Sequence, residues 1–264
     1  SLINAPYLLW SVLFIIAPMI MVVYYAFTDR NGDWTLANIT ALGAYSQTFI
    51  RSIWYAFVAT LICLVLAYPL AYIMSRSSMS KQRTIMMLVM LPMWMNFLIR
   101  TYSWITLLAN TGIINTLLSK IGIGPLHMIN TPGAVILGMV YNFLPFMILE
   151  IHTSLSKMDP SFLEAASDLG ANRTQAFRHV TLPLSIPGII SGITLVFLPA
   201  VSSFFIPKLL GGGQYVLIGN VIESQFLTSG NWSFGSALSL IMVIIIMISM
   251  YLTRKIDRNG GDEI

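Results

Sequence analysis

Charged residues are scarce in this chain. They make up 9% of its 264 residues, whereas soluble domains carry about 25%. Hydrophobic residues account for 56%, and the mean hydropathy is +0.79. A soluble protein is therefore excluded, and the composition predicts an all-α polytopic membrane protein whose apolar stretches cross the bilayer as helices.

Cysteine clusters and catalytic motifs are also missing. Cys63 is the single cysteine, so we expect no disulfide, and Cys63 itself should pack as a small apolar residue. The three histidines are scattered, and the sequence has no serine elbow, no metal-ligand spacing and no Gly-x-x-x-x-Gly-Lys-Ser/Thr phosphate loop. We therefore expect no enzymatic activity, no bound cofactor and no metal site in this chain. Any ATP-driven process would need a nucleotide site on another chain.

Six apolar stretches are long enough to cross a membrane, which takes about 20 residues. We predict spans at about 6–27, 52–74, 84–104, 131–151, 187–207 and 234–253, within a single domain over 1–264. The first stretch lacks a basic leader and an A-x-A-like cleavage site, which indicates a retained helix rather than a signal peptide. Residues 101–130 are of mixed polarity and predict a loop with a short amphipathic helix.

Basic residues are unevenly divided between the two sides of this six-span arrangement. One side carries both termini and the 152–187 segment, and it holds most of them: Arg76, Lys81, Arg83, Lys157, Arg173, Arg178, Arg254, Lys255 and Arg258. The other side holds Arg30, Arg51, Arg100, Lys120 and Lys208. Because cytoplasmic loops carry the excess of Lys and Arg, both termini and the 152–187 segment are predicted to be cytoplasmic. A seventh span at 101–119 would reverse that bias, and we reject it.

Residues 159–188 form the only long polar stretch between two spans. The pattern predicts a short helix, a turn and a second helix, Arg173 to Val180. The caps and stops of these helices follow from local chemistry. They are a cap at Asp159 with Pro160 in the first turn, a left-handed stop at Gly170, a cap at Asn172, and Pro183 and Pro187, which should keep the second helix from running on unbroken.

This hairpin resembles the EAA motif of ABC-importer permeases, which reads Glu-Ala-Ala, three residues, Gly, nine residues, an aliphatic residue, one residue and Leu-Pro. Every spacing is kept here, with Glu164-Ala165-Ala166, Gly170, Val180 and Leu182-Pro183. The resemblance implies a type I ABC-importer permease fold, six transmembrane helices with a cytoplasmic coupling hairpin at 159–183 that docks into an ATPase subunit. The docking residues it implies are Glu164, Ala165, Ala166, Asp168, Gly170, Leu182 and Pro183. The alternative is an amphipathic hairpin that lies on the membrane.

Other stretches resemble the spermidine/putrescine branch of that family, among them residues 98–102, 131–136, 144–147 and 217–222. The resemblance implies a subunit of the bacterial inner membrane that forms half of a polyamine path. It also implies its partners: a second related permease, two ATPase subunits that use ATP and Mg²⁺, and an external polyamine-binding protein, with no nucleic acid. Glu150, Lys208 and Glu223 depart from what that branch leads us to expect, and they leave the cargo open.

Polar and aromatic residues within the spans are candidates for the translocation path. Asn96 and Asn142 are costly to expose to lipid, so we expect them to face the interior of the bundle. Trp94 and Tyr141 could stack against an organic cation.

Lys208 lies at the outer boundary of the fifth span, where an unpaired lysine would repel a cationic cargo. We therefore predict that Lys208 pairs with Glu223, above an outer gate made by Phe204 and Phe205. The alternative is two unrelated surface charges.

Two further functions are consistent with the sequence. One is a sister importer for a different small solute, either another cationic amine or a metal ion. The other is a secondary transporter or channel that needs no ATPase. Against the second stands the scarcity of ionisable residues in the spans, where proton or ion coupling usually requires them.

Overall fold

The computed structural model describes residues 5–29 and 31–261. This part of the chain is helical throughout, and its one β-type pairing is an isolated bridge between Thr28 and Trp34. The helices, in chain order, are α1 (Ala5–Ser11), η2 (Val12–Ile16), α2 (Ala17–Ala26), α3 (Ala37–Thr40), η3 (Ala41–Tyr45), α4 (Ser46–Ser75), α5 (Met79–Met90), η4 (Leu91–Trp94), α6 (Phe97–Leu108), α7 (Ile113–Lys120), α8 (Pro132–Ser156), α9 (Ser161–Asp168), α10 (Arg173–Ala176), η5 (Phe177–Thr181), α11 (Leu182–Ser202), α12 (Phe205–Leu210), α13 (Ile218–Leu227) and α14 (Trp232–Gly261).

Helices occupy all six apolar stretches. Five continuous helical runs are long and apolar enough to cross a membrane, and the third stretch joins them as a bent pair. The five are Pro6–Ala26, Ala37–Ser75, Pro132–Ser156, Arg173–Ser202 and Trp232–Thr253, and the bent pair is Met79–Trp94 with Phe97–Lys120. The protein is thus an all-α polytopic membrane protein, as its composition predicts.

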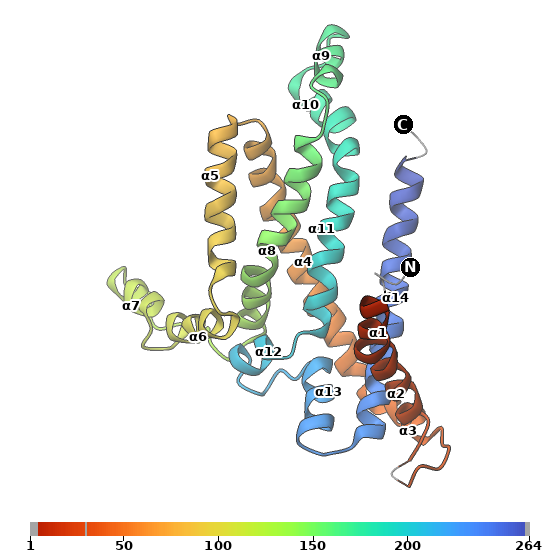
Figure 1. Ribbon diagram of the computed structural model, residues 1–264. Helices are drawn as coiled ribbons and strands as arrows, with labels where there is room; N and C mark the ends of the chain where they lie inside the picture. The colour runs from red at the N-terminus through yellow and green to blue at the C-terminus, as the bar shows by residue number, and fades with distance from the viewer. Residues whose placement is uncertain (1–4, 30, 262–264) are drawn as a thin grey trace.

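The third span differs from the expected helix over 84–104, because the chain bends by 92° between η4 and α6. Pro92 lacks an N–H and weakens the helix there, and the side chain of Asn96 starts a new helix by accepting from the N–H of Leu98 at 2.9 Å. Arg100 fixes the corner, since its Nη1 donates to the carbonyl of Pro92 at 2.8 Å. Helix α6 therefore crosses the end of the bundle instead of continuing α5 (Figure 1).

The fifth span also differs from expectation. Neither Pro183 nor Pro187 stops the second hairpin helix, since Pro183 directly follows the π-turn η5, where the hydrogen-bond register changes, and Pro187 lies inside α11. The chain stays helical from Arg173 to Ser202 and changes hydrogen-bond register at the π-turn η5. The span then ends at Ser202, before the predicted 207, and α12 turns away from it.

Helices α4, α8 and α11 form the packed centre of the molecule (Figure 1). The buried face of α4 is made of small residues spaced three or four apart, namely Ala56, Ala59, Cys63, Ala67 and Ala71. As expected, Cys63 is buried among apolar groups. Lipid supplies no hydrophobic drive between helices, so close packing of small residues holds such a bundle together.

Helices α8 and α11 approach most closely at two buried glycines, Gly188 and Gly192. A Cβ atom at Gly188 would touch the Cβ of Ser154 and would lie 2.9 Å from the carbonyl oxygen of Glu150. A Cβ atom at Gly192 would lie 2.6 Å from the sulfur of Met147. The Gly188 contact is the stricter of the two, because a backbone carbonyl cannot rotate away.

We predict that Gly188→Ala destabilises the protein by about 1–3 kcal/mol, because the added methyl overpacks a rigid contact. Thermal unfolding of the detergent-solubilised protein, followed by tryptophan fluorescence, measures this. Gly43→Ala is the matched control, since nothing lies within 4 Å of a Cβ there. Equal melting temperatures for the two variants would contradict the close α8–α11 contact.

Candidate functional site: a polar hairpin at one end and a pocket at the other

The hairpin begins with a capped helix. The Asp159 carboxylate accepts the backbone N–H of Ser161 at 2.9 Å, and this hydrogen bond holds the pKa of the carboxyl group below its ordinary value. Helix α9 ends as expected at Gly170, whose φ of +80° is in the left-handed region that favours glycine. The next N–H, of Ala171, donates back to the carbonyl of Ala166 at 3.0 Å. The first half of the hairpin is thus fixed at both ends by local hydrogen bonds.

The second half begins with a reciprocal cap. Asn172 Oδ1 accepts from the N–H of Gln175, and Gln175 Oε1 accepts from the N–H of Asn172, both at 2.9 Å. This capping box satisfies two helix donors that otherwise lack partners. The hairpin is therefore a preformed unit, and it projects beyond the C-terminal ends of α4 and α8 (Figure 1).

Helix α9 presents an acidic face to the outside. Glu164, Ala165, Asp168 and Gly170 are exposed and Ala166 is half-buried. Within the described part of the chain, the carboxylates of Glu164 and Asp168 make no ion pair or hydrogen bond. Leu182 and Pro183, the other two candidates for ATPase docking, belong instead to the start of α11, on the far side of the π-turn.

An aromatic contact joins the hairpin to the bundle. The ring of Phe177, in the π-turn, lies edge-on to Tyr68 and Tyr72 of α4, with centroid distances of 5.9 and 5.5 Å. Tyr68 is also hydrogen-bonded to Ser185 of α11 at 2.9 Å. A displacement of the hairpin would therefore reach α4 and α11 together. Sequence reasoning missed this connection, because a π-turn has no recognised sequence pattern.

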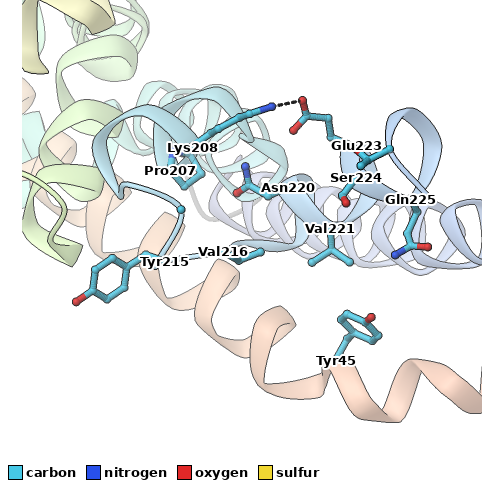
Figure 2. Close-up of a pocket in the computed structure, with 12 residues that line it drawn as sticks. Tyr45, Pro207, Lys208, Tyr215, Val216, Asn220, Val221, Glu223, Ser224 and Gln225 are labelled. Atoms are coloured by element: carbon cyan, nitrogen blue, oxygen red, sulfur yellow. Dashed lines mark hydrogen bonds and ion pairs between the residues drawn. The ribbon is translucent and has the colours of Figure 1, made fainter. Parts of the chain in front are cut away.

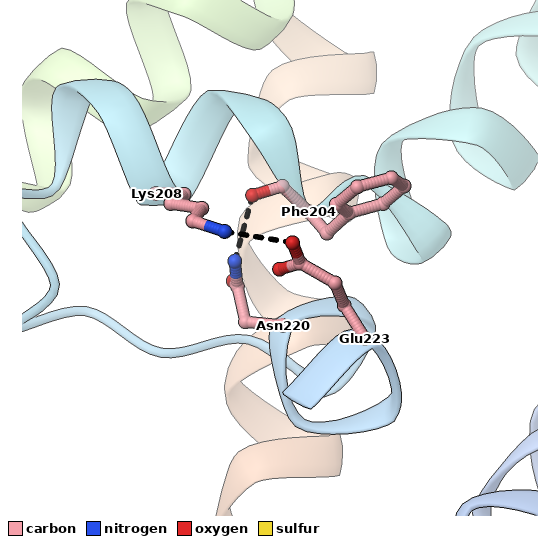
Figure 3. A network of polar contacts seen from close by, with 4 residues as sticks. All are labelled: Phe204, Lys208, Asn220 and Glu223. Atoms are coloured by element: carbon pink, nitrogen blue, oxygen red, sulfur yellow. Dashed lines mark hydrogen bonds and ion pairs between the residues drawn. The ribbon is translucent and has the colours of Figure 1, made fainter. Parts of the chain in front are cut away.

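At the opposite end, the predicted ion pair is present. Lys208 Nζ lies 2.7 Å from Glu223 Oε1, and the lysine is the more exposed partner (Figure 3). Asn220, which sequence reasoning did not single out, stands beside the pair and donates through Nδ2 to the carbonyl of Phe204 at 2.7 Å. The rings of Phe204 and Phe205 lie 4.2 Å apart, between centroids. Thus α12 and α13 are tied together around the pair.

The pair borders a cavity of about 470 Å³ between α13, the start of α12 and the region before α4 (Figure 2). Its wall combines the paired charges of Lys208 and Glu223 with two tyrosines and with amide or hydroxyl groups, among them those of Ser224 and Gln225. Carboxylate and aromatic groups are the usual partners of an organic ammonium ion. The one carboxylate of this wall is available to such an ion only when Lys208 releases it.

The remaining path candidates do not gather at this cavity. Trp94 is 80% exposed at the corner before α6, and Asn96 is exposed and caps that helix, so the expectation that Asn96 faces the bundle interior is wrong for this chain. Asn142 is buried in the bundle, as expected, and its Nδ2 donates to the carbonyl of Gly138 at 2.8 Å. The ring of Tyr141 already makes a cation–π contact within the chain, since the guanidinium of Arg100 lies 5.7 Å from its centroid.

Comparison with known proteins gives consistent matches over most of the chain. Residues 67–259 match the family described as binding-protein-dependent transport system inner membrane component. The spermidine/putrescine transport system permease protein PotB of Haemophilus influenzae is 42% identical over 259 residues, covering 94% of this chain and 91% of that protein. The protein of the same name from Escherichia coli K12 is 39% identical, covering 94% of each. One solved structure, of a bacterial alginate ABC transporter with an alginate pentasaccharide-bound periplasmic protein, superposes with a TM-score of 0.78 over 97% of this chain and 93% of that one at 19% identity, which shows a shared fold.

Proposed function

The chain belongs to the family of binding-protein-dependent transport system inner membrane components, and on that premise we propose that it is a permease subunit of an ATP-driven polyamine importer. It forms half of the translocation path. The relatives that match it over nearly their whole length are named for spermidine and putrescine transport, which supports this cargo.

The observation that carries the proposal is the preformed hairpin. It presents two carboxylates to the outside without partners in the described chain, beside the small side chains of Ala165 and Ala166. A surface of this kind fits a cleft on another protein. The sequence has no phosphate loop of its own, so the partner is the ATPase subunit, which binds ATP and Mg²⁺. Glu164, Ala165, Ala166, Asp168 and Gly170 make the docking contact.

Coupling follows from the way the hairpin is attached. ATP binding closes the pair of ATPase subunits and displaces α9 and α10. Phe177 passes this displacement to α4 through Tyr68 and Tyr72, while the continuous helix passes it directly to α11. The bundle then closes the translocation path on the cytoplasmic side and opens it on the outer side. The inward-open and outward-open states must differ from each other in their affinity for ATP and for the cargo. A ligand shifts an equilibrium only when it binds one of the two states more tightly.

The cargo enters near the Lys208–Glu223 pair. An ammonium group of the polyamine replaces Lys208 at the Glu223 carboxylate, and the released Lys208 ammonium turns into solvent, since its side chain is 56% exposed. Water then solvates the lysine, so opening the pair costs less than it would for a fully buried pair. Phe204 and Phe205 close the path below the pair when it is formed.

The complete importer also contains a second related permease, two ATPase subunits and an external binding protein that delivers the polyamine. Both termini and the hairpin are cytoplasmic in this proposal. The α4–α5 connection, with Arg76, Lys81 and Arg83, lies at the hairpin end of the bundle, whereas α7 and α12 lie at the other end, and this supports the assignment (Figure 1). Arg30 lies outside the described residues, as do the side chains of Arg254 and Arg258.

We expect the chain to co-purify with an ATPase and a second permease encoded beside it. The ATPase activity of the reconstituted complex should rise when the binding protein is added with spermidine or putrescine, because the loaded binding protein favours the outward state. Stimulation by the binding protein with another cationic amine or a metal ion, and none with polyamine, would contradict the cargo. Uptake into liposomes by this chain alone, without ATP, would contradict the mechanism.

The variants Glu164→Lys and Gly170→Asp should each abolish binding of the ATPase subunit while the protein still inserts into the membrane. The first reverses a charge in the contact, and the second adds a carboxylate at a φ of +80° that side chains adopt at a cost of about 1 kcal/mol. Pull-down of the ATPase from detergent extract measures the loss. Asp33→Lys, an exposed charge reversal outside the hairpin, is the control and should leave binding unchanged. Normal assembly of the Glu164→Lys complex would refute the docking role.

Glu223→Lys should lower polyamine uptake at least about tenfold, because two lysines then face the entering cation and like charges in contact cost several kcal/mol. Uptake of labelled spermidine into proteoliposomes carrying the full complex measures this. Lys208→Gln, which keeps the carboxylate, should retain most of the uptake. Undiminished uptake by Glu223→Lys would show that the cargo does not pass this pair.

A further inference from the structure

A second cavity, of about 350 Å³, lies under the hairpin, between it and the inner end of α4. Its walls come from three parts of the chain: the end of α4, helix α9 with the turn after it, and the segment from α10 into the π-turn. The lining residues are Tyr72, Arg76, Leu163, Ser167, Ala171, Arg173, Ala176, Phe177 and Thr181.

The charge on this wall is of one sign. Arg76 follows the last turn of α4 and Arg173 begins α10, so the two guanidinium groups come from separate elements. Among the described lining residues there is no carboxylate, and neither arginine makes an ion pair within the described chain. Leu163 and Ser167, four apart, line the cavity, whereas Glu164 and Asp168 occupy the next stripe of α9 and do not line it. The helix thus turns its acidic face away from the two arginines.

Polar groups without partners add to this wall. Thr181 is 1% exposed, and its Oγ1 has no hydrogen-bond partner in the described structure. A buried hydroxyl in that condition costs free energy. The oxygen is itself enclosed, so the Thr181 side chain must rotate to donate to a group in the cavity. The side chain of Ser167 supplies a second hydroxyl. The guanidinium of Arg76 is held 5.4 Å above the ring of Tyr72, which orders it at the edge of the cavity.

We propose that this cavity binds a phosphate group, held between Arg76 and Arg173 with the hydroxyls of Ser167 and Thr181 as further donors. Arginine forks match phosphate oxygens with paired hydrogen bonds, and two of them from separate elements suit a tetrahedral dianion or phosphodiester. The source is the headgroup of an anionic membrane lipid, because the cavity lies where α4 ends at Ser75 and α11 begins at Leu182, and both helices belong to runs long and apolar enough to cross a membrane. A soluble phosphate has the same chemistry and is separated from the lipid by the test below.

The phosphate site lies where the hairpin meets the bundle, so a bound phosphate affects the orientation of the hairpin. A phosphate bound here bridges the α4–α5 connection and the start of α10, beside the Phe177 contact that joins the hairpin to the bundle. Anionic lipid therefore holds the hairpin in the orientation in which it meets its partner. This consequence rests on the proposed function, whereas binding of the phosphate group does not.

The test uses the assembled complex in nanodiscs of phosphatidylcholine alone or of equimolar phosphatidylcholine and phosphatidylglycerol. Native mass spectrometry counts retained phosphatidylglycerol, and thermal unfolding measures stabilisation. Arg76→Gln and Arg173→Gln should each weaken lipid retention by about tenfold, the value of one charge-assisted hydrogen bond. Arg178→Gln is the matched control, since Arg178 is an exposed arginine of the same hairpin that does not line the cavity. Its retention should equal that of the unaltered protein.

A separate arm adds inorganic phosphate to the complex in phosphatidylcholine, with sodium chloride at equal ionic strength for comparison. Saturable stabilisation by phosphate that Arg76→Gln removes, with no effect of phosphatidylglycerol, supports the site and assigns it to a soluble anion. Equal losses of lipid in Arg178→Gln and Arg76→Gln would overturn the proposal, because they would show a general attraction of the basic surface. Retention unchanged in both cavity variants would overturn it as well. These experiments measure lipid or phosphate binding and not transport. They therefore test the phosphate site even if polyamine does not stimulate the ATPase activity of the complex.

Discussion

The close approach of α4, α8 and α11 is the constraint on which the rest of the structure depends. In lipid the helices gain nothing by hiding apolar surface from one another, so the bundle is held by contacts that only small residues allow. Gly188 and Gly192 bring α11 against α8, and the alanine face of α4 lies within the same buried core. The hairpin connects α8 to α11, and α12 follows directly from the end of α11. The hairpin and the pocket at the opposite end are therefore both attached to the same packed centre.

The two ends differ in their charge. The hairpin presents carboxylates that have no partner in the described chain, whereas the pocket at the opposite end holds a carboxylate already paired with lysine. Carboxylates without partners can form ion pairs with basic groups of another protein. A pair whose lysine is exposed suits a transient contact, because water solvates the lysine when the pair opens. This division agrees with the family to which the chain belongs, whose members work with a binding protein on one side of the membrane.

Sequence reasoning found the features that local chemistry determines. It missed those that depend on how a helix is oriented relative to the rest of the bundle. The caps at Asp159 and Asn172 and the stop at Gly170 follow from residue types at fixed spacings. The Lys208–Glu223 pair follows from a charge argument, that an unpaired lysine would repel a cationic cargo. The 92° bend before α6 does not, because a hydropathy window scores Phe97–Leu108 alike whether the helix crosses the membrane or lies along it. Asn96 was misread for the same reason, since an asparagine can cap a helix or line a bundle. Pro183 and Pro187 were expected to interrupt the helix, yet the π-turn before Pro183 changes the hydrogen-bond register and the helix continues past both.

The bend also sets the thickness of membrane that the protein can occupy. The straight part of the third span, Met79–Trp94, is roughly 24 Å long at about 1.5 Å per residue, whereas the hydrocarbon core of a bilayer is about 30 Å thick. Helix α4, which contacts α5, and helix α14, on the far side of the bundle, are longer than the core requires. A short span favours a thinner bilayer, so we expect thinning beside α5 rather than beside α14, which draws headgroups and water inward on that flank. The protein would be sensitive to the acyl-chain length of its lipids, and short-chain lipids would match its α5 flank best.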